Sequence, residues 1–263
     1  MKRVRSHFSK IAHIYDDLRT TDQEPILFIK ERLEHLDRIE AADIGCGGGR
    51  YDVRLFEQLG KRLWLTCIDD SEEMLKELTK KLQKHKISNY RTMRTEARVL
   101  PLKDECLDVV ITLNALHHFM VLDFFQEAAR VLKDDGYLFI YTRLRSQNKE
   151  SIWGRFFPQF HEKEERLHEL CELKEILRTV PALRLRSTNY FRYKRKAKLK
   201  KLIAQAKNHH YSTFYLYDQQ EFEEAVGRFE ANIVRHFDNP EDIVWHDRNV
   251  MLTIRRKTRR QRR

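Results

Sequence analysis

The sequence of 263 residues has no apolar run of the roughly 18 residues that a membrane-spanning helix needs. It also lacks the hydrophobic stretch of a signal peptide, because the basic residues Lys2, Arg3 and Arg5 are followed by polar Ser6 and His7. The two absences argue against an integral membrane protein and against an exported one. We therefore expect a cytoplasmic protein without a transmembrane segment.

Cysteine is scarce, and no metal-binding pattern is present. The four cysteines form no CxxC pair, which argues against a disulfide framework and against a zinc knuckle. His117 and His118 are adjacent, so their side chains diverge, and they form no HxxxH pattern with a third ligand. We expect reduced thiols and no metal.

Acidic residues are missing from two basic segments, although the net charge of the whole chain is +11. Ten Lys or Arg and no acid lie between Leu183 and Tyr211, and seven more basic residues follow Ile254. The rest of the chain therefore carries more acidic than basic side chains. These segments are either a solvated surface with an unstructured tail or the binding site of an anionic partner.

Strand-like and helix-like segments alternate over the first 150 residues. Thr21 and Glu24 have the spacing of a capping box at the start of a helix, and a short strand leads into Asp43. We predict further strands at 62–68, 90–95, 107–113 and 137–142, helices at 23–37, 50–59, 71–84 and 119–132, and a turn at 134–136. Such alternation predicts an α/β protein with a doubly wound, Rossmann-like sheet of about seven mostly parallel strands.

The alternation breaks at Arg143 and resumes at Asp218. We predict helices at 162–179, 196–207 and 218–229, and strands near 231–237 and 244–255. Residues 143–217 are interpreted as a helical, basic insertion that caps the active site, between two parts of the core, 1–142 and 218–255. A separate C-terminal domain is the alternative. Residues 256–263 are expected to be a disordered basic tail.

The segment Asp43-Ile44-Gly45-Cys46-Gly47-Gly48-Gly49 is a glycine-rich turn between a strand and a helix. Glycines allow a ligand to approach the backbone, and the N-terminus of the helix offers free N–H groups. Asp69 and Asp70 end the next strand, where a carboxylate can accept hydrogen bonds from both hydroxyls of a ribose. On these two features alone, a nicotinamide-dependent dehydrogenase remains an alternative.

Five segments in order resemble the motifs of class I methyltransferases that use S-adenosylmethionine (SAM), within the broad type 11 group. They are the glycine-rich turn, Ile68–Leu75, Glu96–Leu102, Leu107–Phe119 and Ala129–Gly136. That group includes quinone, sterol and some tRNA methyltransferases. The resemblance implies an enzyme that binds SAM and releases S-adenosylhomocysteine. A non-catalytic SAM-binding or scaffolding protein of the same fold is a further alternative.

The resemblance places nine residues at the cofactor: Asp43, Gly45, Cys46, Gly47, Asp69, Asp70, Glu96, Ala97 and Asn114. Gly45 and Gly47 would lie against the methionine part of SAM, and Asp69 would hold the ribose. Glu96, where the group commonly has Asp, would face the adenine amino group. Asp43 would reach the methionine amine through water, unless it only caps the next helix, and Asn114 would meet the amine with its backbone carbonyl.

The acceptor is less well defined than the donor. Residues 8–16 resemble the segment that covers SAM in this group, which makes Tyr15 a catalytic candidate together with His117 and His118. Aromatic and basic residues are mixed in the insertion, which suits a small or anionic metabolite. RNA, bound through 183–211 and the C-terminal tail, is the second hypothesis. No RNA-binding module is recognisable.

Overall fold

The computed structural model describes residues 20–258. The N-terminal segment that contains Tyr15 lies outside the described residues, as do residues 259–263. No helix within the described range is long and apolar enough to span a membrane.

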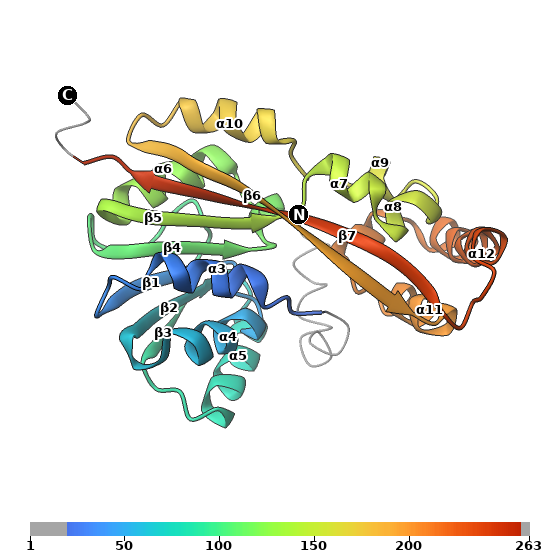
Figure 1. Cartoon of the computed structure of the whole chain (residues 1–263), viewed down its shortest axis with the longest axis horizontal. Helices are drawn as coiled ribbons and strands as arrows, with labels where there is room; N and C mark the ends of the chain where they lie inside the picture. The colour runs from blue at the N-terminus through green and yellow to red at the C-terminus, as the bar shows by residue number, and fades with distance from the viewer. Residues whose placement is uncertain (1–19, 259–263) are drawn as a thin grey trace.

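Seven strands form one sheet in the order β3-β2-β1-β4-β5-β7-β6 (Figure 1). The strands are β1 (Ile39–Ile44), β2 (Leu63–Asp69), β3 (Tyr90–Arg94), β4 (Leu107–Leu113), β5 (Leu132–Thr142), β6 (Leu183–Ala197) and β7 (Ile243–Arg256). β1 to β5 pair in parallel, whereas β7 runs antiparallel to both of its neighbours. The predicted fold class, a mostly parallel α/β sheet of about seven strands, is confirmed.

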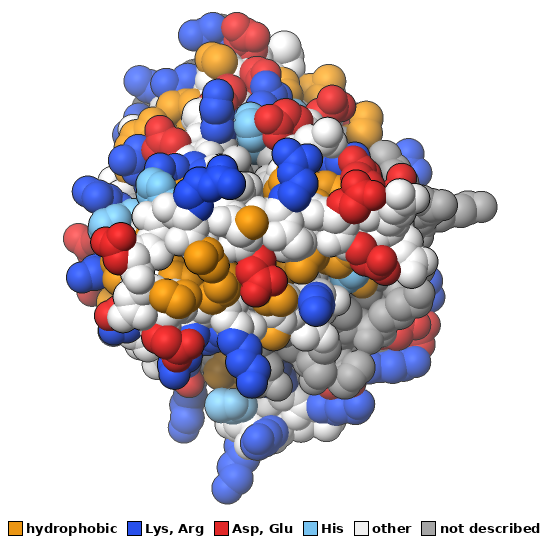
Figure 2. All heavy atoms as spheres, turned by 90° about the vertical axis from the view of Figure 1, so that its right-hand side faces the viewer, with side chains coloured by type: hydrophobic (Ala, Val, Ile, Leu, Met, Phe, Trp, Pro, Cys, Tyr) orange, Lys and Arg blue, Asp and Glu red, His pale blue; other side chains and the backbone are white. Residues whose placement is uncertain are grey.

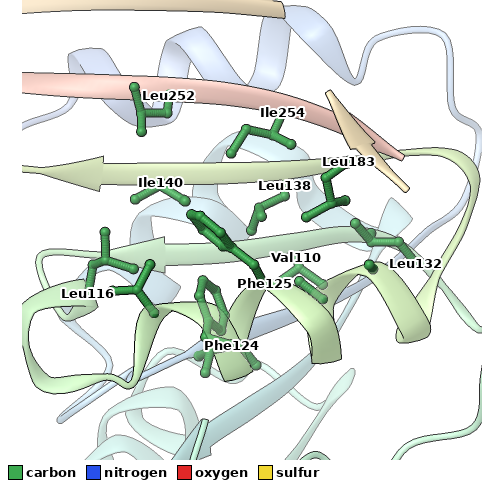
Figure 3. Close-up of a cluster of buried hydrophobic side chains, with 14 of the residues drawn as sticks. Val110, Leu116, Phe124, Phe125, Leu132, Leu138, Ile140, Leu183, Leu252 and Ile254 are labelled. Carbon is green, nitrogen blue, oxygen red and sulfur yellow. The ribbon is translucent and has the colours of Figure 1, made fainter. Parts of the chain in front are cut away.

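Helices cover both faces of the sheet. The helices of residues 20–258 are α3 (Glu24–Arg32), α4 (Arg50–Leu59), α5 (Glu72–Lys84), α6 (Val121–Val131), α7 (Arg145–Glu150), α8 (Ile152–Phe156), α9 (Phe160–Lys163), α10 (Leu170–Arg178), α11 (Leu199–Lys207) and α12 (Gln219–His236), with 3-10 turns η1 (Gly60–Arg62), η2 (Leu116–His118) and η3 (Ser212–Leu216). On one face, α6 and α10 pack over β4, β5 and β7; Figure 3 shows Phe124 and Phe125 of α6 against Val110 and Ile140. On the other face, the apolar sides of α3, α4 and α5 form a second core with buried residues of β1, β2, β4 and β5.

The two helices nearest the glycine-rich turn begin and end as their sequences predict. α4 begins after Gly49, whose φ is 76°, and ends at Gly60, whose φ is 61°. α5 begins after Ser71, whose Oγ accepts a hydrogen bond from the Met74 N–H at 3.3 Å. Ser is a favoured N-cap because its hydroxyl satisfies one of the free donors of the first turn.

The first described helix differs from its prediction. α3 begins at Glu24 after Gln23, without a side-chain cap, so the predicted capping box of Thr21 is absent. The helix also stops at Arg32 and does not reach residue 37. Its end is held from outside, since the Arg62 guanidinium donates to the carbonyls of Leu33, Glu34 and Leu36 at 3.3, 3.4 and 2.7 Å.

Residues 134–136 form a bulge within β5 and not a turn before it. Leu132 pairs with Leu107, and pairing resumes at Tyr137 opposite Val109, so the residues between them are extruded. Asp135 takes a φ of 62°, and its carboxylate lies 2.9 Å from Arg255. A Cβ on Gly136 would lie 3.0 Å from the Lys133 carbonyl, which explains why glycine is needed at the end of the bulge.

The C-terminal half contains the largest departures from prediction. Residues 183–197, interpreted above as part of the insertion, form β6, which pairs with β7 along almost its whole length. The strand predicted near 231–237 is helical, because α12 continues to His236 and keeps Phe229 and Ile233 on its buried side. Arg256 is buried within β7 and contacts Glu105 at 2.7 Å, so the predicted disordered tail cannot begin there.

The β6–β7 ribbon, the part of these two strands that extends beyond the ends of β1 to β5, supports a third hydrophobic core (Figure 1). This core combines α8, α11 and α12 with the ribbon residues Ile243 and Trp245. Its centre is aromatic: Trp153 stacks on Phe229 with ring centroids 4.9 Å apart. Short helices and a strand pair therefore form a packed cap at one end of the sheet.

Replacing Phe229 with Ala should lower the free energy of unfolding by about 3–5 kcal/mol, since this ring is 0% exposed and its removal leaves a cavity. Val234→Ala on the same helix is the control: the side chain is 55% exposed, and the change should stay within about 0.5 kcal/mol. Urea unfolding followed by circular dichroism measures both. Equal midpoints for the two variants would contradict the packed cap.

Candidate active site

A cavity of about 540 Å³ opens at the carboxyl ends of β1, β2, β4 and β5. β1 and β4 are neighbours in the sheet although they are not consecutive in the chain, so the connections diverge to opposite faces between them. Ligands of open α/β sheets bind at such a point. Residues of the cap close the other side of the cavity, among them Trp153, Tyr211 and Trp245.

The glycine-rich turn forms one wall of this cavity, and its glycines serve different purposes. Gly45 has a φ of 74°, and a Cβ there would lie 2.5 Å from the Ala115 Cβ and 3.0 Å from the Phe119 ring. Gly47 has a φ of 54° but no atom within 4 Å of an added Cβ. Gly45 is thus required by packing within the protein, whereas Gly47 leaves its space open to a ligand.

Asp69 connects the end of β2 to this turn. One carboxylate oxygen accepts the Gly47 N–H and the other accepts the Ser71 N–H, each at 2.9 Å. Each oxygen keeps further acceptor capacity for a ligand hydroxyl. Burial raises the pKa of Asp69 to about 6, although the N–H groups of Ser71 and Gly47 oppose that shift.

Two more carboxyl groups are buried beneath the turn. Burial, with repulsion from Asp52 and Asp69, holds the pKa of Asp43 well above its usual range. Asp43 lines the cavity, and its Oδ1 has no hydrogen-bond partner within residues 20–258. It does not cap α4, whose N-cap is Gly49 without a side-chain bond, so that alternative is wrong.

Asp52, which the sequence did not single out, lies in the first turn of α4. Its carboxyl accepts the Cys67 S–H at 3.4 Å, and burial raises the pKa of Asp52 to about 7. Burial also raises the pKa of the Cys46 and Cys67 thiols, as expected for unreactive cysteines.

All nine residues predicted at the cofactor lie around this one cavity: Asp43, Gly45, Cys46, Gly47, Asp69, Asp70, Glu96, Ala97 and Asn114. Glu96 accepts a hydrogen bond from Arg98 at 2.7 Å. Asn114 has a φ of 60°, and its N–H donates to the Tyr141 carbonyl at 2.7 Å. The Asn114 side-chain carbonyl accepts from the Asn249 amide at 3.2 Å, which connects β7 to the end of β4.

His117 and His118 lie in η2, directly after β4, and both line the cavity. Their ring centroids are 3.9 Å apart, so the expectation that the two side chains diverge is wrong. Among the described residues there is no group of three or more His, Cys, Asp or Glu side chains that could hold a metal.

A chain of ion pairs on the far side of the cavity was not predicted. Arg195 of β6 contacts Asp22 at 2.6 Å and Asp247 of β7 at 3.4 Å. Asp247 in turn contacts Arg143, at the end of β5, at 3.3 Å. Burial disfavours the charged Arg143, yet the acidic and phenolic groups around it, chiefly Asp247, keep its pKa above the usual value.

His210 is a third histidine at the cavity, and it was also missed. It is buried, and its Nδ1 lies 3.1 Å from the Gln205 carbonyl oxygen. A carbonyl oxygen only accepts, so Nδ1 carries the proton in the neutral ring and Nε2 has the lone pair. Its backbone N–H also donates to the Gln205 carbonyl, at 3.1 Å, which fixes the residue after α11.

Gly45→Ala should lower the free energy of unfolding by about 2–5 kcal/mol, the sum of a left-handed backbone cost and overpacking against Ala115. Gly47→Ala, where nothing crowds the new methyl group, should cost only about 1–2 kcal/mol. Urea denaturation of both variants provides the comparison. A Gly45→Ala protein as stable as the Gly47→Ala protein would show that Gly45 is not required by packing.

Residues 42–140 match the family model of a methyltransferase domain. The chain is 31% identical over 135 residues to the uncharacterized methyltransferase YcgJ of Bacillus subtilis. This alignment covers 49% of the chain and 51% of YcgJ. It is 30% identical over 146 residues to the demethylmenaquinone methyltransferase of Listeria welshimeri. This alignment covers 52% of the chain and 61% of that protein. The chain thus spans only about half to three fifths of these curated relatives.

Solved structures agree on the fold. The crystal structure of YcgJ aligns with a TM-score of 0.63 at 15% identity, over 90% of this chain and 99% of that one. The [4+2]-cyclase SpnF aligns with a TM-score of 0.59 at 17% identity, over 90% of this chain and 81% of that one. The predicted class I methyltransferase fold is confirmed. Because that fold also occurs in a cyclase, the activity must be argued from the site.

Proposed function

We propose that the chain transfers a methyl group from SAM to a small acceptor, since residues 42–140 match the family model of a methyltransferase domain. The observation that carries this proposal is the Asp69 carboxylate at the end of β2, which orders the open Gly47 turn and keeps acceptor capacity for a ribose. The unpartnered Oδ1 of the buried Asp43 supports it further, because a cationic ligand would compensate it.

The residues around the turn can be assigned to the parts of SAM. We infer that Gly45 and Gly47 face its methionine part, that Asp69 accepts its ribose hydroxyls and that Glu96 and Ala97 lie at its adenine. Asp43 and the backbone carbonyl of Asn114 would hold the amine. When bound, SAM supplies an electrophilic methyl group, and S-adenosylhomocysteine leaves.

The residues near the methyl acceptor would contribute mainly by orienting it, and less by a proton transfer that every acceptor requires. Holding a nucleophile in line with the methyl group supplies much of the rate enhancement, and a base is needed only for a protonated acceptor. We propose Tyr15, His117 and His118 for this role, and add His210, whose Nε2 lone pair is set by its contact with Gln205. Single Ala variants that lower turnover and leave SAM affinity unchanged support such a role. Parallel losses of both would identify packing residues.

SAM affinity should depend on the ionisation of Asp69. Its pKa is raised to about 6, so Asp69 is almost fully ionised above pH 7 and becomes protonated as the pH falls below 6. Only the ionised carboxylate can accept hydrogen bonds from both ribose hydroxyls. The dissociation constant at pH 5 should be about tenfold higher than at pH 7.5. Asp69→Asn should cost about 1.5–3 kcal/mol of SAM binding at pH 7.5 and flatten this profile.

Calorimetric titration with SAM between pH 5 and 7.5 tests this, and circular dichroism verifies the fold of each variant. Asp52→Asn is the matched control, because Asp52 is also buried with a raised pKa but does not line the cavity. That variant should keep the pH dependence. A folded Asp69→Asn protein with unchanged SAM affinity would refute the proposed cofactor site.

RNA is the second candidate acceptor. One exposed face of the β6–β7 ribbon carries Arg192 and Lys194 beside Tyr190, which is 63% exposed, and this mixture suits stacked bases and phosphates. Against it, Arg195 is paired inside the protein and Lys196 with Asp242. Figure 2, which views this end of the molecule, shows acidic side chains interspersed among the basic ones. A small acceptor is therefore favoured.

If RNA binds here, changing Arg192 and Lys194 to Gln should reduce the log–log salt slope of binding by about 0.7–0.9 for each lost phosphate contact. Fluorescence anisotropy with bulk tRNA at several salt concentrations measures this slope. Lys61→Gln, on the opposite end of the sheet in η1, is a control for net charge. Absence of binding to the unchanged protein at low salt would exclude the RNA hypothesis.

A further inference from the structure

The acceptor end of the cavity contains a buried amide without a partner. Asn148 of α7 lines the cavity and is only 4% exposed. Its Nδ2 has no hydrogen-bond partner within the described part of the chain. Leaving a buried donor unsatisfied costs about 1–3 kcal/mol, so such a group at a cavity wall indicates a ligand atom that accepts from it.

The backbone around Asn148 is tightly fixed. Its N–H donates to the Leu144 carbonyl at 2.9 Å, and its own carbonyl accepts from the Ser151 hydroxyl at 2.7 Å. α8 lies so close that a Cβ on Gly154 would be 2.1 Å from the Asn148 carbonyl oxygen. The amide is therefore held at the wall by the contact between α7 and α8.

A second unpartnered donor faces the same cavity from the β6–β7 ribbon. The Trp245 Nε1–H is buried and has no hydrogen-bond partner among residues 20–258. Trp245 pairs with Arg195 in the ribbon register, so it lies next to the ion-paired wall of the cavity. The third donor, the Arg143 guanidinium, comes from the end of β5 and already contacts Asp247 and Tyr211.

The charges at this wall are balanced. Arg143 is paired with Asp247, and Arg195 with both Asp22 and Asp247. Two neutral N–H donors and compensated cations suit a single negative charge spread over two oxygens. They suit a dianionic phosphate poorly, because a wall without net charge offsets neither of its two charges, and burying two uncompensated charges costs more than burying one. The rings of Trp153, Phe160 and Tyr211 line the neighbouring surface and provide an apolar contact.

We propose that Asn148, Trp245 and Arg143 form a binding site for the carboxylate of a small, largely apolar monocarboxylic acid. That this acid is the methyl acceptor rests on the function proposed above. The site itself depends only on the donors at the wall. The remainder of the acid lies against the aromatic rings of the cap, toward the glycine-rich turn.

The three tryptophans of the chain, Trp64, Trp153 and Trp245, allow a direct test with nitrogen-15-labelled full-length protein. Benzoate is the probe, with phenyl phosphate and benzyl alcohol as the dianionic and neutral comparisons. Benzoate should shift the indole N–H resonance of Trp245 at lower concentration than either comparison. The resonance of Trp64, which lies on β2 and does not line the cavity, should not move.

Asn148→Leu and Trp245→Phe should each weaken benzoate binding by about tenfold, the loss of one hydrogen bond to a charged group. The Trp153 resonance reports binding in the Trp245→Phe protein. Asn148→Asp, which keeps the shape of the side chain but opposes an anion, should weaken binding more than Asn148→Leu. Lys149→Ala, at the exposed next position of α7, is the control and should bind as the unchanged protein does.

The inference is overturned if benzoate leaves Trp245 unmoved, or if phenyl phosphate or benzyl alcohol shifts it at lower concentration than benzoate. It is equally overturned if folded Asn148→Asp binds benzoate normally. SAM calorimetry on the same sample separates the two proposals. SAM binding without a benzoate site would leave the methyltransferase proposal standing alone, and a benzoate site without SAM binding would leave only the carboxylate site.

Discussion

The close contact between Gly45 and the segment after β4 is the constraint on which the cavity depends. A backbone turn at the end of β1 fits against Ala115 and Phe119 with no room for a side chain. This contact fixes where η2 begins, and so the positions of His117 and His118. It also leaves Gly47, two residues later, directed at open space. The same turn thus packs tightly against the protein at Gly45 and stays open to the cavity at Gly47.

The distribution of charged side chains differs between the two ends of the cavity. Beneath the turn, Asp43, Asp52 and Asp69 are gathered in a buried region where their pKa values rise because burial disfavours their charges. At the other end, acids and bases alternate in ion pairs from Asp22 to Arg143. A cationic ligand would relieve the first region, and a ligand with a single negative charge suits the unused donors of the second. The two ends therefore favour ligands of opposite charge.

Sequence reasoning succeeded where the relevant contacts are local. The strand–turn–helix units around Gly49 and Ser71 follow from capping residues and apolar spacing within a dozen residues. The residues predicted at the cofactor line one cavity, and their contact with SAM stays a prediction. β6 was missed because its charge density concealed an alternation of exposed Arg192 and Lys194 with inward Tyr193 and Arg195. The ion-paired wall of the cavity could not be predicted, since Asp22 and Arg195 are 173 residues apart in the chain and meet only in the folded protein.

The β6–β7 ribbon has a consequence for how such a protein can diversify. Its strands are joined by main-chain pairing from Arg192–Arg248 to Ala197–Ile243, and main-chain pairing does not depend on which side chains project inward. An inward position such as Trp245, which takes part in no ion pair of the cavity wall, can therefore be exchanged without disturbing the register or the glycine-rich turn. Evolution can then change the ligand at the tip of the ribbon while the opposite half of the cavity stays the same. Acceptor choice becomes a matter of a few substitutions on a fixed frame.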